Sequence, residues 1–259
     1  MSVSELMQTA AGHFSRREFG QAAELYEQVL QTLPGHAEAL ANLGAVNLVG
    51  RAYAEAEAYY RRALEVTPDF VVAGLGLVKT LLAQHRHDDA LDQLQAMNRD
   101  GLLSDTDRPE FYKLIGIIHA AKEDWDVAIN FFSKYQAEQP GELDPYLCLR
   151  NAYTKDNRVA ELADLYETLS VKFPNYPEAR THLIQLRGRE GGYEAIRHSF
   201  DRMLQNAPHD LSLYNIMAVV SLESRKYAYA YLYFLRAKRN NPDADWKAYP
   251  GLVRLEVFA

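Results

Sequence analysis

Few residues of this chain have the type and spacing that chemistry requires. The most suggestive group spans residues 85–89, where His85 and His87 precede Asp88 and Asp89. Imidazole nitrogens and carboxylates can bind zinc. A short polar run is also the usual content of a surface turn, which is the interpretation favoured here, and no metal site is predicted.

The remaining candidates for chemistry are isolated. Cys148 is the only cysteine and has no sequence partner that would activate it. Gly191 and Gly192 are not followed by the Lys-Ser or Lys-Thr of a phosphate-binding loop. His119 is expected to pack in a helical core. We therefore predict no catalytic residues, no cofactor and no enzyme activity.

A regular spacing of prolines organises the chain instead. Successive members of one set lie 34 residues apart, except for one interval of two periods plus four residues: Pro34, Pro68, Pro140, Pro174, Pro208 and Pro242. A fixed period of this length is the signature of a repeat protein. Because proline lacks an N–H and clashes with the preceding turn, each one is expected to end a helix.

Each period contains the same pair of residues on one helical face. With repeats beginning near residues 3, 37, 71, 109, 143, 177 and 211, position 20 is small or aliphatic and position 24 is large. The pairs are Ala22 and Tyr26, Ala56 and Tyr60, Ala90 and Leu94, Ala128 and Phe132, Leu162 and Tyr166, Ile196 and Phe200, and Ala230 and Phe234. Residues four apart share a helical face, so each repeat is predicted to be a helical hairpin that stacks on its neighbours.

The pattern resembles the tetratricopeptide repeat family. Residues 37–68 match it best, through Leu40, Leu43, Gly44, Ala56, Tyr60, Ala63 and Pro68. The resemblance implies an all-α, right-handed superhelical solenoid of about seven helix-turn-helix repeats over residues 1–244. Three repeats depart from the pattern: Leu102 replaces a proline, and Arg150 and Ile184 replace a small residue at position 8, where looser packing is expected.

Composition limits the classes of partner and compartment. One cysteine suits a reducing compartment, and no segment has the roughly 20 apolar residues of a membrane span. We expect a soluble, cytoplasmic protein. Residues 1–129 carry a net charge of −8 and residues 130–259 of +1, whereas nucleic acid binding requires a concentrated basic surface. No nucleic acid partner is predicted.

The resemblance also implies a concave groove lined by positions 2, 5, 9, 12 and 13 of each first helix. Residues 71–83 are apolar nearly all round, with Lys79 as their one charge, which indicates either a bound partner or packing between repeats. The predicted function is a non-catalytic adaptor or scaffold that binds a peptide or amphipathic helix there. The predicted groove residues are Leu75, Lys79, Leu82, Lys113, Ile117, Leu147, Asn151 and Asn215.

The C-terminal segment leaves several alternatives open. Residues 245–259 are apolar and follow a tyrosine-rich helix, so Tyr229, Tyr233 and Trp246 are candidates for an interface. The segment is expected either to fold back as a cap, to begin a further module, or to form a homodimer contact. Two alternative functions follow: a substrate-recruiting region of a larger enzyme, such as a bacterial glycosyltransferase or sulfotransferase, and a self-associating assembly scaffold.

Overall fold

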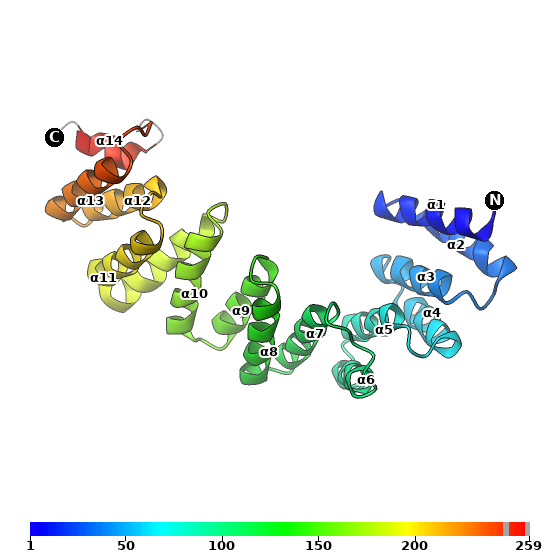
Figure 1. Ribbon diagram of the computed structural model, residues 1–259. Helices are drawn as coiled ribbons and strands as arrows, with labels where there is room; N and C mark the ends of the chain where they lie inside the picture. The colour runs from blue at the N-terminus through cyan, green and yellow to red at the C-terminus, as the bar shows by residue number, and fades with distance from the viewer. Residues whose placement is uncertain (246–248, 257–259) are drawn as a thin grey trace. The chain divides into compact units, whose positions relative to one another are not determined.

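The computed structural model describes residues 1–245 and 249–256, and the regular secondary structure of that part is entirely α-helical (Figure 1). The chain divides into two compact units, Met1–Pro145 and Tyr146–Ala259. They are called the N-terminal unit and the C-terminal unit below, and each is described by itself.

The N-terminal unit contains four helical hairpins in chain order. They are α1 (Val3–Ser15) with α2 (Phe19–Thr32), α3 (Ala37–Val49) with α4 (Tyr53–Val66), α5 (Val71–Ala83) with α6 (His87–Arg99), and α7 (Arg108–Ala121) with α8 (Trp125–Glu138). The first helices α3, α5 and α7 contact one another in succession (Figure 1). The second helices α2, α4 and α6 each contact the first helix of the hairpin that follows. Apolar side chains are therefore buried between the two helices of each hairpin and between one hairpin and the next.

The C-terminal unit continues the same plan. It contains most of α9 (Asp144–Lys155), then α10 (Val159–Lys172), α11 (Glu178–Asn206), α12 (Leu211–Glu223) and α13 (Tyr227–Asn240). Helix α11 is a hairpin in itself, because Gly191 and Gly192 leave helical geometry, with Gly192 at φ 62°. The two glycines thus form the turn inside a repeat, where the sequence places it.

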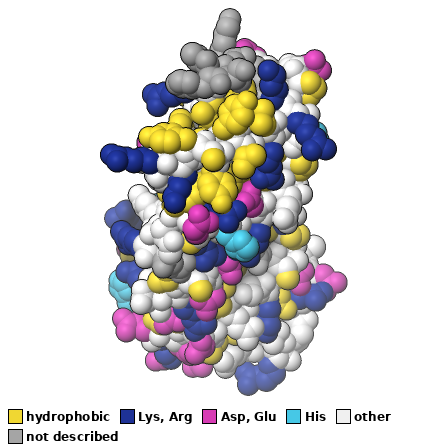
Figure 2. Space-filling model, turned by 90° about the vertical axis from the view of Figure 1, so that its left-hand side faces the viewer, with side chains coloured by type: hydrophobic (Ala, Val, Ile, Leu, Met, Phe, Trp, Pro, Cys, Tyr) yellow, Lys and Arg dark blue, Asp and Glu magenta, His cyan; other side chains and the backbone are white. Residues whose placement is uncertain are grey.

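The C-terminal unit ends with a short helix, α14 (Pro250–Glu256), which packs against α12 and α13. Leu252 and Leu255 of α14 are buried in this contact. Beside it, the outer side of α13 exposes a patch of hydrophobic side chains with Lys and Arg side chains around it (Figure 2).

The turn inside every hairpin except that of α11 uses one left-handed residue. Six residues at repeat position 15 have φ between 56° and 62°: Arg17, Arg51, His85, Glu123, Asn157 and Arg225. A left-handed residue just past a helix C-terminus lets the chain reverse while the last carbonyls keep their partners. His85 therefore lies in a turn, as the sequence indicates, and His87 begins α6 two residues later.

The small and large residues at positions 20 and 24 are buried in all seven repeats. Ala22, Ala56, Ala90, Ala128 and Ala230 have no exposed surface, and the large residue of every pair is at most 5% exposed. The pairing predicted from the sequence is thus confirmed as the core of each hairpin.

Tyr60 shows how closely these helices approach. Its ring lies between Gly44 of its own repeat and Gly76 of the next, where a Cβ atom would come within 2.8 Å and 2.4 Å of ring carbons respectively. Burial raises the pKa of the Tyr60 hydroxyl to about 12. Because glycine faces the ring on both sides, Tyr60 has no room to move away from an added methyl group.

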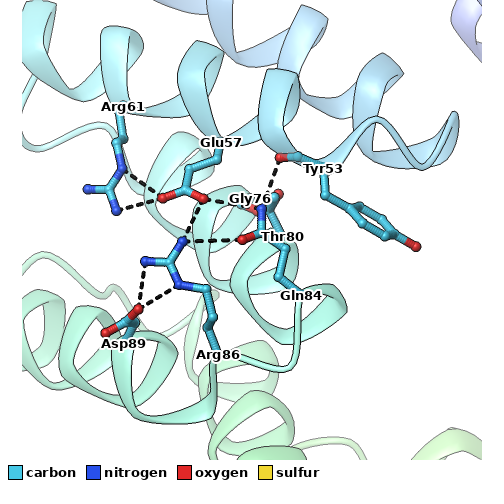
Figure 3. A network of polar contacts seen from close by, with 8 residues as sticks. All are labelled: Tyr53, Glu57, Arg61, Gly76, Thr80, Gln84, Arg86 and Asp89. Carbon is cyan, nitrogen blue, oxygen red and sulfur yellow. Dashed lines mark hydrogen bonds and ion pairs between the residues drawn. The ribbon is translucent and has the colours of Figure 1, made fainter.

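A polar network joins the second and third repeats (Figure 3). Glu57 of α4 accepts hydrogen bonds from Arg61 at 2.8 and 3.0 Å, from Gln84 at 3.1 Å and from Arg86 at 2.8 Å. Burial raises the pKa of the Glu57 carboxyl, but these hydrogen bonds outweigh it, so the pKa lies below the ordinary value. The network fixes the turn between α5 and α6 against α4.

A buried arginine has a similar role in the C-terminal unit. The guanidinium of Arg180 donates to Asp210 at 2.7 Å and to the carbonyl oxygen of Ser170 at 3.1 Å. Asp210 in turn caps the N-terminus of α12 by accepting from the N–H of Ser212 at 2.9 Å. Arg180 therefore links α10, α11 and α12, and the charge of its buried guanidinium is compensated.

We expect Gly76→Ala to lower the free energy of unfolding by about 1–3 kcal/mol, because overpacking of a filled core costs this much. The added Cβ would lie 2.4 Å from the Tyr60 ring. Chemical denaturation would measure the change, with Gly20→Ala as control, since a Cβ there meets nothing within 4 Å. Adding Tyr60→Leu to Gly76→Ala should cost less than the sum of the single changes, and strict additivity would contradict this packing.

We expect Glu57→Gln to lower the free energy of unfolding at neutral pH by on the order of 1–2 kcal/mol, since hydrogen bonds between charged partners are lost. The folded state depresses the pKa of Glu57, so its contribution is fully present above the unfolded-state value. It disappears as the pH falls through the folded-state value.

The difference in unfolding free energy between the native chain and Glu57→Gln should therefore shrink from pH 6 to about pH 3. Denaturation curves over this range would measure it. Glu65→Gln, which changes an exposed carboxylate of the same helix, is the control and should show a much smaller difference at every pH. A difference for Glu57→Gln that stays constant with pH would contradict the network's role.

Candidate partner-binding surfaces

Five predicted groove residues lie on two neighbouring helices of the N-terminal unit. Leu75, Lys79 and Leu82 belong to α5, whereas Lys113 and Ile117 belong to α7. Helices α5 and α7 contact each other directly. The structure therefore places these residues on two first helices that are in direct contact.

Leu75 does not have the exposure that a ligand contact needs. Its side chain is only 9% exposed and belongs to the core cluster that runs from α3 to α7. Most of α5 is buried in the same way, including Ala73, Leu77 and Leu81. Of the two alternatives that the sequence leaves open for this apolar helix, packing between repeats accounts for most of its buried surface.

The two lysines are paired within the layer. Lys79 forms an ion pair with Glu110 of α7 at 2.8 Å, and Lys113 forms one with Asp144 of α9 at 2.7 Å. Asp144 also accepts from the Tyr135 hydroxyl at 3.0 Å. The hydrogen bond from Lys113, followed by that from Tyr135, holds the pKa of the Asp144 carboxyl below its usual value although burial opposes this shift. Each lysine thus links one repeat to the next, and a partner's carboxylate would have to compete for it.

Partly exposed apolar side chains nevertheless remain at the groove positions. Leu82 and Ile117 are half-buried, and Val49 and Val72 are exposed. We call these four residues the groove row. Val49 and Val72 were not among the predicted site residues. They occupy groove position 13 of the second repeat and groove position 2 of the third, so the groove columns of the repeat alignment identify both.

The predicted groove residues of the C-terminal unit have varied surroundings. Leu147 is half-buried on α9, and Asn151 is exposed on the same helix. The side-chain oxygen of Asn151 accepts hydrogen bonds from Arg150 at 2.9 and 3.3 Å. Its amide is therefore oriented by the preceding residue.

Asn215 is already in contact with another part of the chain. Its side-chain oxygen accepts a hydrogen bond from the N–H of Gly251 at 2.8 Å. A Cβ at Gly251 would lie 2.6 Å from a methyl group of Val219 and 2.9 Å from the Asn215 carbonyl oxygen. Helix α14 therefore lies against groove positions 5 and 9 of α12, which Asn215 and Val219 occupy.

The predicted C-terminal interface is partly wrong. Tyr233 is 2% exposed, and its hydroxyl donates to Asp201 of α11 at 3.1 Å. Burial, followed by the Asp201 charge, raises its pKa. Tyr229 is 37% exposed, and its ring centroid lies 5.8 Å from that of Tyr193. Trp246 lies outside the described residues. The exposed tyrosines of α13 are Tyr227, Tyr229 and Tyr231.

The histidines lie apart from any cluster of ligands. The His85 and His87 rings are 6.0 Å apart, and His119 is half-buried, with its Nδ1 atom 3.0 Å from Asp124. Within residues 1–245 and 249–256, no group of three histidine, cysteine, aspartate or glutamate side chains is arranged to hold a metal ion. None of the helices in this part of the chain has the length and apolar character that crossing a bilayer requires.

Family models of the tetratricopeptide repeat match two overlapping stretches, residues 10–69 and residues 51–115. The hairpins of both units have the same architecture. Residues 10–115 therefore carry tetratricopeptide repeats. Repeats of this family form protein-interaction modules, and the fold supports that role for this protein. A search of curated protein sequences finds no match.

Solved structures with a similar fold include tetratricopeptide repeat proteins. One from Parabacteroides merdae is 14% identical, with a TM-score of 0.58 and coverage of 98% of each chain. Pseudomonas aeruginosa pilF is 16% identical, with a TM-score of 0.54 and coverage of 99% of this chain and 97% of its own. YrrB, described as having an unusual peptide-binding site, is 13% identical, with a TM-score of 0.53 and coverage of 79% of this chain and 99% of its own. At these identities the likeness establishes the fold.

We expect Gly251→Ala to loosen α14 from α12, because the added methyl group would overlap Val219 and the Asn215 backbone. Overpacking of this kind costs about 1–3 kcal/mol, so amides of residues 252–256 should exchange with solvent roughly tenfold faster or more. Hydrogen exchange measured by mass spectrometry would test this. Gly188→Ala is the control in the same unit, since its Cβ would make only an ordinary contact at 3.7 Å. Equal protection in both variants would show that α14 does not depend on this close approach.

Proposed function

We propose that this protein is a non-catalytic interaction module that binds a peptide or amphipathic helix of a partner protein against the groove row of the N-terminal unit. The observation that carries the proposal is that apolar side chains remain exposed or half-buried at groove positions of three successive repeats, namely Val49, Val72, Leu82 and Ile117. An amphipathic helix suits such a surface, since it offers one apolar face and satisfies its own backbone groups.

The ion pairs beside the groove row support the same mode of binding. Charges of alternating sign follow the first helices, in the ion pairs of Lys79 with Glu110 and of Lys113 with Asp144. Paired charges at the rim of an interface favour a register and a partner more than they add affinity. The peptide-binding site described for YrrB, a protein of the same fold, is consistent with this use of the architecture.

We expect Leu82→Glu combined with Ile117→Glu to weaken peptide binding by about 10- to 100-fold, since charges at apolar anchor positions cost on the order of 2 kcal/mol or more. Both residues are half-buried, so these variants disturb the core less than a change at buried Leu75 would. Peptides selected from a displayed library on the native chain would be titrated against each variant by fluorescence anisotropy.

The matched control is Leu33→Glu combined with Val66→Glu. These exposed apolar residues lie at the ends of second helices, away from the groove positions, and the double change adds the same charge. Circular dichroism would verify that both variants remain helical. Peptides that bind the native chain and the Leu82→Glu, Ile117→Glu variant equally, or a library that yields no binders, would overturn the proposal.

A further inference from the structure

The outer face of α13 exposes a continuous set of apolar side chains. Tyr227 is 63% and Leu232 is 51% exposed, and Tyr231 and Leu235 are exposed as well. We call these four residues the C-terminal patch. In Figure 2 hydrophobic side chains gather over this end of the unit. The spacing of the four residues places them along one side of the helix.

The first six repeats do not carry such a patch at the equivalent positions. Positions 22 and 25 of their second helices are polar in every case but one: Glu24 and Glu27, Ala58 and Arg61, Asp92 and Gln95, Asn130 and Ser133, Asp164 and Glu167, and His198 and Asp201. In the seventh repeat both are leucine, Leu232 and Leu235. The repeat architecture therefore does not require apolar residues here.

The seventh repeat also differs from the first six in the exposure of positions 17 and 21. In each of the first six repeats the residues at these positions are buried or half-buried, whereas Tyr227 and Tyr231 of the seventh are exposed. Helix α14 packs against α12 and α13 but leaves Tyr227 63% and Tyr231 38% exposed. A groove of about 580 Å³ remains between the helices, lined by Leu222, Tyr227, Tyr231 and Leu255.

Cations lie at both ends of the C-terminal patch. Arg225 and Lys226 precede α13, Lys238 and Arg239 belong to its last turn, and no acidic residue occurs from Ser224 to Asn240. The helix dipole favours cations at the C-terminus but disfavours them at the N-terminus. It therefore accounts for Lys238 and Arg239 and leaves Arg225 and Lys226 unexplained.

We infer that the C-terminal patch is a docking surface for an amphipathic helix of a partner protein that carries an apolar stripe and carboxylates at both ends. An apolar side chain of that helix enters the groove beside Tyr231 and Leu255, and its carboxylates meet the cations at the two ends of α13. The groove favours a protein helix over a lipid surface, because a side chain can fill a concave apolar site whereas a membrane surface spans it. This surface shares no residue with the groove row.

Two designed helical peptides with the same leucine stripe provide the test, one with glutamates and one with lysines at both ends. By fluorescence anisotropy, the glutamate peptide should bind the native chain at least about tenfold more tightly than the lysine peptide, and its affinity should fall as salt is added. Leu232→Glu combined with Leu235→Glu should abolish this binding. Both residues are exposed, so the variant should fold, as circular dichroism would verify.

Two control variants make the result specific. Leu33→Glu with Val66→Glu adds the same charge at other exposed sites, and Leu82→Glu with Ile117→Glu removes the groove row. Both control variants should bind the glutamate peptide as tightly as the native chain does. Failure of the proposed function and failure of this inference are therefore distinguishable. Equal binding of the two peptides, or binding that survives Leu232→Glu with Leu235→Glu, would overturn the inference.

Two further results would assign the patch to another occupant and overturn the inference as well. One is binding to vesicles of phosphatidylserine and phosphatidylcholine that is lost in Leu232→Glu with Leu235→Glu while neither peptide binds. The other is a concentration-dependent dimer of the native chain, seen by light scattering, that the same variant abolishes while neither peptide binds.

Discussion

The structure depends on one constraint: a two-helix hairpin cannot bury its apolar face alone. The small residue at position 20 lets the helices approach, and the large residue at position 24 fills the space between one hairpin and the next. Tyr60 makes both contacts, with Gly44 of its own repeat and Gly76 of the following one. Stability is therefore shared between hairpins and their interfaces.

Polar contacts between repeats restrict how one hairpin can stack on the next. Glu57 joins α4 to the turn that follows α5, and Arg180 joins three helices of the C-terminal unit. Lys79 and Lys113 link successive first helices. Most of these groups are shielded only in part, so their net energies are modest, but a charge left unpaired beside a core is costly. They therefore favour one register of the stack over its alternatives.

The surfaces left over after stacking are the ones available to partners. In the N-terminal unit they are the apolar side chains of the groove row, because neighbouring repeats cover Leu75 but not Val49 or Val72. In the C-terminal unit, α14 lies on the groove positions of α12, so the exposed apolar surface is on α13 instead. A repeat protein that buries each hairpin against the next has free apolar faces mainly along its first helices and at its ends.

The sequence by itself determined the repeat, the hairpins, and the burial of positions 20 and 24, because these follow from spacing along single helices. It also placed Gly191 and Gly192 at a turn. Only the tertiary structure decided that Leu75 and Tyr233 are buried and that Lys79 and Lys113 are paired. It also decided that α14 hydrogen-bonds to Asn215. These outcomes depend on which side chains of a neighbouring helix come within a few ångströms, and the period of a repeat fixes the order of its helices but not those contacts.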